Sequence, residues 1–297
     1  MRIVIAGGSG FLGRKLVNRL EGEGHSVAIL TRRPTRPRDV QWNPDGTSGS
    51  LPGRLDGQDA VINLAGEGIA DRRWSTERKA ALRSSRILST QTLVRAVAQC
   101  ANPPKVFISA SAVGYYGPRG DEPINEATPA GSDFLSRLCV EWEQVARMVE
   151  SRATRLAIVR TGIVLARDGG ALPRMLLPFK VGLGATVATG DQFMPWIHVD
   201  DWTALVSWLV QNDRAAGVFN AAAPSPVMNR TFTRLLARVL NRPAILHTPA
   251  FVLRAALGEM STILVNGQRV LPAAAEQLGF RFTHRELEPA LRSVLGA

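Results

Sequence analysis

Apolar residues in the first half of the chain recur at two different spacings. Short apolar runs predict buried strands over 1–6, 26–30, 40–42, 60–64, 105–109 and 156–160. Between these runs, apolar side chains at helical spacing predict helices from Phe11 onward, over 76–100 and over 132–150. Strands that alternate with helices are typical of an α/β fold, a doubly wound parallel sheet with helices on both faces.

The alternation stops after Leu165, where glycine and proline interrupt the chain repeatedly between Gly169 and Pro195. We therefore predict a first domain over 1–165 and a smaller C-terminal α/β lobe over 166–297. The chain is expected to return to the first domain around 196–222, with a helix to about Asn212 and one more strand. Further helices are predicted near 230–240, 249–258 and 284–295.

Glycines connect the first predicted strand to the first predicted helix. Gly7, Gly10 and Gly13 have the spacing that lets a strand turn tightly, brings backbone N–H groups close to a diphosphate and packs the next helix against the strand. The diphosphate would meet the N-terminus of that helix, where free N–H groups and the macrodipole favour an anion. The pattern favours a dinucleotide site over a merely structural turn. Its candidate residues are Gly7, Ser9, Gly10, Phe11, Leu12 and Gly13.

The second predicted strand ends at Thr31, Arg32 and Arg33. In a dinucleotide-binding fold the residue at this point faces the adenosine ribose, where a carboxylate would bind the 2′-hydroxyl and repel a 2′-phosphate. A guanidinium is instead a bidentate and permanently charged partner for phosphate. The arginines therefore predict NADP as the cofactor. The alternative interpretation is a solvated arginine pair before the break at Pro34.

Hydroxyl groups follow the strand predicted at 105–109, on the same edge of the sheet as the glycine loop. Ser109 and Ser111 are followed by Tyr115 and Tyr116, with small residues between them. We expect these hydroxyls to lie where a nicotinamide and a substrate would meet. The alternative is a serine-rich turn whose side chains bond its own backbone.

The number and distribution of charged residues indicate whether nucleic acid is a partner of the chain. The 297-residue chain carries a formal net charge of +11. Its only lysines are Lys15, Lys79, Lys105 and Lys180, and its arginines are scattered singly, without a long basic run. We therefore do not expect nucleic acid as the main partner.

Two further features bear on compartment and metal content. Cys100 and Cys139 lie in helix-like surroundings without a CxxC or Cys/His cluster, so we predict core thiols, no disulfide framework and no metal. No stretch approaches the ~20 apolar residues of a membrane span, and the chain begins with a strand rather than a signal peptide. We expect a cytoplasmic protein with a small-molecule substrate and no membrane partner.

Taken together, the motifs resemble the extended short-chain dehydrogenase/reductase superfamily, and within it the group called "epimerase family protein", which ends in a domain of unknown function. The motifs are the Gly7–Gly13 loop, VINLAGE from Val61, Arg72-Arg73-Trp74, SASAVGYYG from Ser109, DFLSRLCVEWE from Asp133, RTGIVLARDGGAL from Arg160, GLG from Gly182 and PWIHVDD from Pro195.

The resemblance covers essentially the whole chain. It implies a Rossmann-type sheet, NADP binding and a substrate cleft between two lobes. By position it implies that Leu64, Ala65 and the adjoining Gly66 contact the middle of the cofactor. It also implies that Arg86 and Ile163 line the outer and nicotinamide sides.

The sequence departs from the superfamily's catalytic pattern. The superfamily uses a Ser or Thr, a Tyr as general acid/base and a Lys four residues later, but those last two positions align with Asp133 and Arg137 here. No Tyr-x-x-x-Lys occurs anywhere in the chain. Arg137 could supply positive charge and a ribose contact, but it cannot release its proton.

Two functions remain open from the sequence. The first is an NADP-dependent oxidoreductase or epimerase on a small carbonyl, alcohol or sugar-like substrate, with Ser109 or Ser111 polarising the oxygen and Tyr115 or Tyr116 exchanging the proton. The second is an NADP-binding regulator or redox sensor with little turnover. Two roles also remain for His198, a proton relay or a hydrogen-bonded structural residue, and the sequence favours the structural role.

Overall fold

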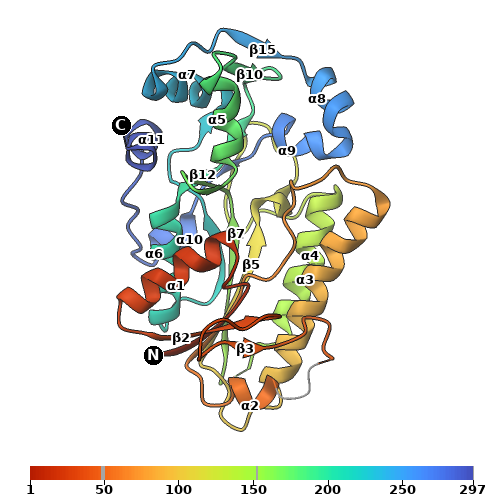
Figure 1. Cartoon of the computed structure of the whole chain (residues 1–297), viewed down its shortest axis with the longest axis vertical. Coiled ribbons are helices and arrows are strands. Elements are labelled where there is room, and N and C mark those ends of the chain that lie inside the picture. The colour runs from red at the N-terminus through yellow and green to blue at the C-terminus, as the bar shows by residue number, and fades with distance from the viewer. Residues whose placement is uncertain (48–50, 152, 297) are drawn as a thin grey trace.

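A seven-stranded parallel sheet forms the centre of the computed structural model, which describes residues 1–47, 51–151 and 153–296 (Figure 1). Every neighbouring pair of strands in this sheet is parallel. In spatial order the strands are β13 (Gly217–Ala221), β7 (Arg155–Thr161), β5 (Val106–Ala112), β4 (Ala60–Asn63), β1 (Arg2–Ala6), β2 (Ser26–Thr31) and β3 (Val40–Gln41).

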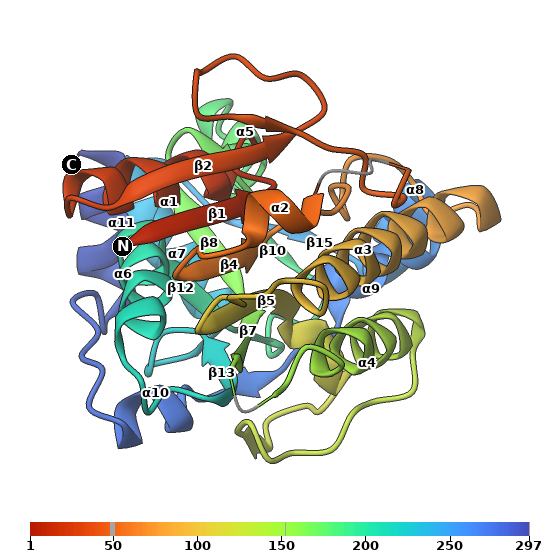
Figure 2. The ribbon, with the colours of Figure 1, turned by 90° about the horizontal axis from the view of Figure 1, so that it is seen from below.

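Helices cover both faces of the sheet (Figure 2). One face carries α1 (Phe11–Gly22), α6 (Val199–Gln211) and α10 (Ala273–Gln277), and the other carries α2 (Leu51–Leu55), α3 (Thr76–Val97) and α4 (Phe134–Arg147). Strand β1 divides its side chains between the two cores, with Ile3 and Ile5 on the first face and Val4 and Ala6 on the second. A strand that is buried on both faces reads as a continuous apolar run, as the sequence of β1 does.

The strand order reverses beside β1, which lies between β2 and β4. The chain runs outward from β1 to β3 and then returns to add β4, β5, β7 and β13 on the other side. Ligands of open parallel sheets bind beyond the carboxyl ends of the strands at such a reversal. The Gly7–Gly13 loop leaves β1 at this point.

The remaining elements form mainly the second lobe, at the top of Figure 1. Its helices are α5 (Leu172–Lys180), α7 (Asn229–Leu240), α8 (Ala250–Leu257), α9 (Thr262–Val265) and α11 (Leu287–Leu295), with 3-10 turns η1 (Val113–Tyr116) and η2 (Gly258–Ser261). The short strands are β6 (Pro123–Ile124), β8 (Ile163–Ala166), β9 (Gly169–Gly170), β10 (Ala185–Val187), β11 (Phe193–Met194), β12 (Trp196–His198), β14 (Val227–Met228), β15 (Leu246–Thr248) and β16 (Arg269–Val270).

The predicted fold class is confirmed, with two local corrections. Strand β5 was expected to end at Ser109 but continues to Ala112, because Ser111 pairs in register with Arg160 on β7. Ser111 therefore lies in the strand, as Ser109 was predicted to, and not in a turn after it. Helix α4 begins after its N-cap Asp133, whose carboxylate accepts a hydrogen bond from the main-chain N–H of Ser136, and it ends at Arg147 rather than at the expected Glu150.

We propose the division into domains that was predicted from the sequence, a first domain over 1–165 and a second lobe over 166–297. The chain returns to the first domain around 196–222. Strand β13 at the edge of the main sheet supports this return. The tail also contributes to the first domain, since Ala275, Phe280 and Phe282 pack in the core on the α1 face of the sheet.

Candidate cofactor and active site

The glycine loop has the close approaches that the sequence pattern requires. Gly7 has a φ of +78°, and a Cβ atom there would lie 2.7 Å from the main-chain carbonyl of Leu64. A Cβ atom on Gly13 would overlap the carbonyl oxygen of Gly7, so only glycine lets α1 pack this closely against the loop. Around Gly10 a Cβ atom would meet only one atom, the carbonyl oxygen of Gly7. The loop is tight toward the protein and open on its outer side.

The N-terminus of α1 is available to an anion. Gly10 is its N-cap and provides no capping side chain, and Ser9 and Gly10 are exposed. The guanidinium of Arg14 donates a hydrogen bond to the carbonyl oxygen of Ser9 at 2.6 Å, which steadies the loop from outside. Phe11 and Leu12, in the first turn of α1, are half-buried. Uncapped N–H groups of a helix, held in a rigid loop, bind a diphosphate well.

The end of β2 carries two cations with no ion-pair partner in the described part of the chain. Arg32 and Arg33 are both exposed, whereas nearby Arg36 is held by Glu21 and Asp39 at 3.0 Å each. Thr31 bonds the main chain of Arg33 through its hydroxyl and so shapes this turn. Two guanidinium groups are thus free at the position where a dinucleotide's 2′-phosphate is expected.

Side chains packed behind the end of β4 support the turn that follows this strand. The buried Asn63 accepts a hydrogen bond from the main-chain N–H of Ala65 at 3.1 Å and donates one to Thr90. Arg86 donates to the carbonyl oxygen of Glu67 at 2.9 Å and packs behind Gly66. Burial lowers the pKa of Arg86. Arg86 therefore supports the Leu64–Glu67 turn. The cofactor contact that the resemblance implies for Arg86 stays a prediction.

Ile163 begins β8, and its main-chain N–H donates to the carbonyl oxygen of Pro195 at 2.7 Å. Its side chain is half-buried. The preceding Gly162 allows this approach, because a Cβ atom there would overlap the same carbonyl oxygen. Ile163 thus lies beside the carboxyl end of β7, the side on which a nicotinamide is expected.

A buried ion pair dominates the edge where the catalytic hydroxyls were predicted. Arg160 on β7 donates two hydrogen bonds of 2.8 Å to the carboxylate of Glu143 on α4, and both side chains are almost fully buried. Burial opposes the charge of Arg160, but the bonds and charge of Glu143 raise its pKa above the usual value. Ser111 donates its hydroxyl hydrogen to the same carboxylate at 2.7 Å. That hydrogen cannot polarise a substrate carbonyl while it is bound to Glu143.

The two tyrosines have different surroundings. Tyr116 is fully buried, donates to Asn220 at 2.7 Å and accepts from Arg160 at 3.0 Å. Burial raises the pKa of Tyr116 to about 12. Tyr115 is half-buried, and the centroid of its ring lies 3.3 Å from the guanidinium carbon of Arg160. Its hydroxyl makes no hydrogen bond to the described residues. Of the two phenols, only that of Tyr115 is unengaged.

The other candidate catalytic residues are also engaged or remote. Ser109 is buried, and its hydroxyl makes only a long 3.3 Å contact with the carbonyl oxygen of Ala110. Arg137 is exposed and bonds the carbonyl oxygen of Ser132. Asp133, at the position of the superfamily tyrosine, is the N-cap of α4. Ser109 and Arg137 are therefore not joined to Tyr115 by any hydrogen bond in the described chain.

Sequence reasoning missed the residues that organise this edge. Glu143, Asn220 and Glu126 were not singled out, yet Asn220 bonds Tyr116 and its main-chain N–H bonds Glu126 at 2.9 Å. One signal was available. Arg160 directly follows the apolar run 156–159 of a buried strand, and a charge at such a place needs a buried partner.

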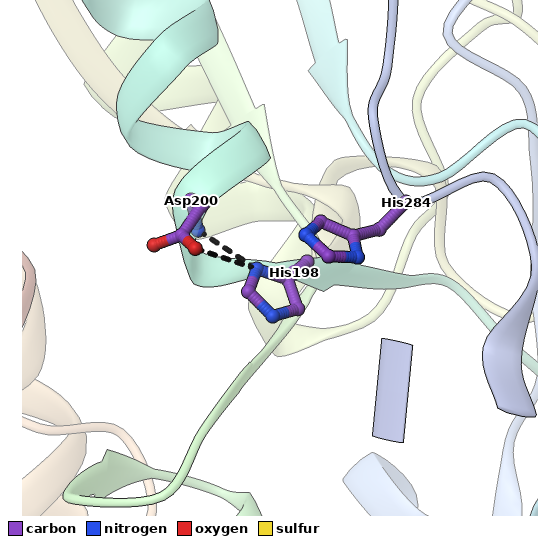
Figure 3. A group of neighbouring side chains, drawn as sticks. All are labelled: His198, Asp200 and His284. Carbon is purple, nitrogen blue, oxygen red and sulfur yellow. Dashed lines mark hydrogen bonds and ion pairs between the residues drawn. The ribbon is translucent and has the colours of Figure 1, made fainter. Parts of the chain in front are cut away.

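His198, Asp200 and His284 also come together, beside the N-terminus of α6 (Figure 3). His198 Nδ1 accepts the main-chain N–H of Asp200 at 3.0 Å, so its lone pair is already used. The two imidazole rings are stacked with centroids 3.7 Å apart and planes at 16°. Lone pairs lie in the ring planes, so those of parallel stacked rings do not converge on one ion. This geometry favours a helix-capping role for His198 over metal binding or a proton relay.

The fold and the glycine loop define a class, the NAD(P)-binding proteins with a Rossmann-type sheet. Residues 3–222 match the family model described as the NAD dependent epimerase/dehydratase family, and residues 248–294 match a domain of unknown function, DUF1731. The chain belongs to this epimerase family of extended short-chain dehydrogenases/reductases, as its motifs indicated.

Relatives match over almost the whole chain. An epimerase family protein of Mycobacterium tuberculosis is 41% identical over 97% of this chain and 96% of its own length. The bovine epimerase family protein SDR39U1 is 38% identical over 99% and 100%. The crystal structure of human SDR39U1 with NADPH has a TM-score of 0.93 and 35% identity, and covers 100% of this chain and 99% of that one.

Proposed function

We propose that the protein is an NADP(H)-dependent oxidoreductase or epimerase that acts on a small carbonyl, alcohol or sugar-like substrate. The observation that carries the cofactor assignment is the pairing of an uncapped α1 N-terminus with two unpaired arginines at the end of β2. The diphosphate would lie on Gly7–Gly13, and the 2′-phosphate on Arg32 and Arg33. The NADPH in the structure of the human relative supports this choice.

The chemistry would rest on Tyr115 alone among the predicted hydroxyls. The bound nicotinamide supplies hydride chemistry, while the phenol of Tyr115 exchanges a proton with the substrate oxygen. Arg160 holds the tyrosine ring by stacking against it, and Glu143 holds Arg160. Because the hydroxyl hydrogen of Ser111 is bonded to Glu143, the Ser111 oxygen can accept a hydrogen bond but cannot donate one to a substrate.

A regulator or sensor is the second candidate, and one observation favours it. Ser109, Ser111 and Tyr116 are all buried, and the last two are bonded within the protein. Fewer groups are therefore available for proton transfer than the sequence suggests. NADPH binding without turnover, accompanied by a change in partner binding, would favour this role.

The cofactor assignment is tested by fluorescence titration with NADPH and NADH. Wild type should bind NADPH more tightly, and Arg32→Ala with Arg33→Ala should lose most of that preference, about 1–3 kcal/mol for charge-assisted bonds. Arg36→Ala is the matched control, since Arg36 already has two acidic partners. Equal wild-type affinities for the two cofactors would refute the 2′-phosphate assignment.

The catalytic assignment is tested with a panel of carbonyl compounds and sugar nucleotides, followed by NADPH oxidation and isomer analysis. For any substrate found, Tyr115→Phe should lower the rate about 10²- to 10⁴-fold. Tyr116→Phe should leave the rate close to wild type, provided that the variant is folded. An unchanged rate in Tyr115→Phe would remove the tyrosine from the mechanism.

A further inference from the structure

Two long segments of the second lobe contain no acidic residue. Neither 169–190 nor 223–258 includes Asp or Glu, whereas they contain two and five Lys or Arg residues, respectively. These segments form α5, β10, α7, β15 and α8, which lie together at the end of the molecule farthest from β1 and β2 (Figure 1). The charged side chains of these two segments are therefore all positive.

Some of these cations are neutralised by acidic residues from elsewhere in the chain. Arg174 pairs with Asp71, Arg230 with Asp191 and Arg238 with Glu288. In contrast, Lys180, Arg242 and Arg254 are exposed and make no ion pair with the described residues. Free positive charge thus remains around α8 and the connections between α5 and β10 and between α7 and β15.

Large apolar side chains are exposed on the same segments. We call them the distal apolar face: Leu177 (61% exposed), Val181 (70%), Leu183 (56%), Ile245 (87%), Leu246 (44%), Phe251 (71%) and Val252 (42%). The main-chain N–H of Leu183 bonds the carbonyl oxygen of Pro178, and that of Leu246 bonds the carbonyl oxygen of Gly184, so the end of α5, the start of β10 and β15 are neighbours. Helix α8 follows β15 directly along the chain. Helix α8 has the sequence AFVLRAAL and no buried residue. An exposed apolar patch of this kind marks an interaction site.

We propose that the distal apolar face docks on an anionic lipid surface. The apolar side chains would enter the boundary between headgroups and acyl chains, while Lys180, Arg242 and Arg254 contact anionic headgroups. Charge decides between occupants. A second copy would bring the same unpaired cations against each other, in a protein with a net charge of +11, whereas an anionic bilayer complements them.

This docking concerns the membrane surface and not a span. Among the described residues, no helix is long and apolar enough to cross a bilayer. The proposal departs from the sequence-based expectation of no membrane partner, because only the structure reveals that these apolar side chains are exposed. It does not depend on the identity of the cofactor or substrate.

The test is co-sedimentation of the full chain with vesicles of phosphatidylcholine alone or mixed with phosphatidylserine. The wild type should bind the mixed vesicles about a hundredfold more tightly, at roughly fivefold for each of three basic residues. Added salt should weaken this binding. Equal binding to both vesicle types, or binding to neither, would overturn the proposal.

Variants separate the two contributions. Ile245→Glu and Phe251→Glu should each abolish most binding, and Met148→Glu is the control, since Met148 is 73% exposed at the end of α4, outside the lobe. Arg242→Glu and Arg254→Glu should weaken binding at least about fivefold each, while the same change at Arg95, an exposed residue of α3 outside the lobe, should not. Circular dichroism verifies that every variant is folded.

Sedimentation equilibrium addresses the competing occupant. In the absence of vesicles, the Ile245→Glu variant should have the same molecular mass in solution as the wild type. A dimer that Ile245→Glu dissociates would show that a second copy covers the face and would overturn the lipid proposal. The lipid proposal would also be overturned if the Ile245→Glu and Phe251→Glu variants both bound vesicles as tightly as the wild type.

Discussion

The two ends of the proposed site differ in how far their polar groups are already engaged. At the cofactor end, the α1 N-terminus is uncapped and Arg32 and Arg33 are exposed without ion pairs in the described chain. At the catalytic end, Ser111, Glu143, Arg160 and Tyr116 bond one another inside the protein. The first end is prepared for a ligand, and the second is already satisfied by its own side chains.

The two ends therefore have different physical tasks. Backbone N–H groups and surface guanidiniums bind a phosphate with little rearrangement. A buried ion pair usually gives little net stability but is very costly to break. The Arg160–Glu143 pair is therefore better understood as a device that holds Tyr115 and the carboxyl end of β5 in one arrangement. Breaking each end separately tests this view.

The largest effect is expected from Glu143→Ala, which leaves the buried Arg160 without its counter-charge. The loss should be about 3–5 kcal/mol in the free energy of unfolding, measured by urea denaturation. Glu141→Ala, on the same helix as Glu143, removes the partly exposed pair with Arg83 of α3 and should cost at most about 1 kcal/mol. Similar losses in the two variants would contradict a special role for the buried pair.

Gly13→Ala should damage the cofactor end. Its methyl group would overlap the carbonyl oxygen of Gly7, so the loop must shift at a cost of about 1–3 kcal/mol and NADPH affinity should fall about tenfold or more. Gly22→Ala is the control in the same helix, because a Cβ atom there meets nothing within 4 Å. Isothermal titration with NADPH measures both. Unchanged affinity in Gly13→Ala would place the diphosphate elsewhere.

Tyr116→Phe should have a smaller effect and sharpen the distinction between the tyrosines. Removing the hydroxyl leaves Asn220 without its donor, which should cost about 1–2 kcal/mol of stability in urea. Tyr115→Phe removes an unengaged hydroxyl and should leave stability within about 0.5 kcal/mol of wild type. The roles assigned to the two residues would be reversed if Tyr115→Phe were the more destabilised variant.

The smallest effect is a pH dependence at His198. Burial, and then the charge of His284, lowers the pKa of His198 in the folded protein. Below about pH 6.5 the unfolded chain binds this proton more readily than the folded one, so His198 makes stability fall as the pH drops toward its folded pKa.

Asp200, Asp201 and His284 face this ring, and the two carboxylates partly oppose the shift. Replacing His198 by Asn, which also caps helices, should flatten the fall in Tm between neutral and mildly acidic pH. An unaltered slope in His198→Asn would assign the acid sensitivity to another group.

Much of the cofactor end could be predicted from the sequence because its determinants are contiguous. A strand, Gly7, Gly10, Gly13 and a helix follow one another directly, and the end of the next strand lies only a short distance further along the chain. The apolar pattern likewise predicted the sheet and its helices, and the family was confirmed. Local spacing specifies a turn and a helix start without help from distant residues.

The hydrogen-bonding state of the predicted hydroxyls could not be predicted from the sequence, because it depends on contacts between distant elements. Ser111, Glu143, Arg160 and Asn220 lie on β5, α4, β7 and β13, far apart in sequence, and their partners become known only when these elements pack. The same holds for α8, whose apolar sequence suggests burial but which stays exposed. Hydrogen-bond partners and burial depend on which surfaces meet in three dimensions, and the order of residues along the chain does not specify this.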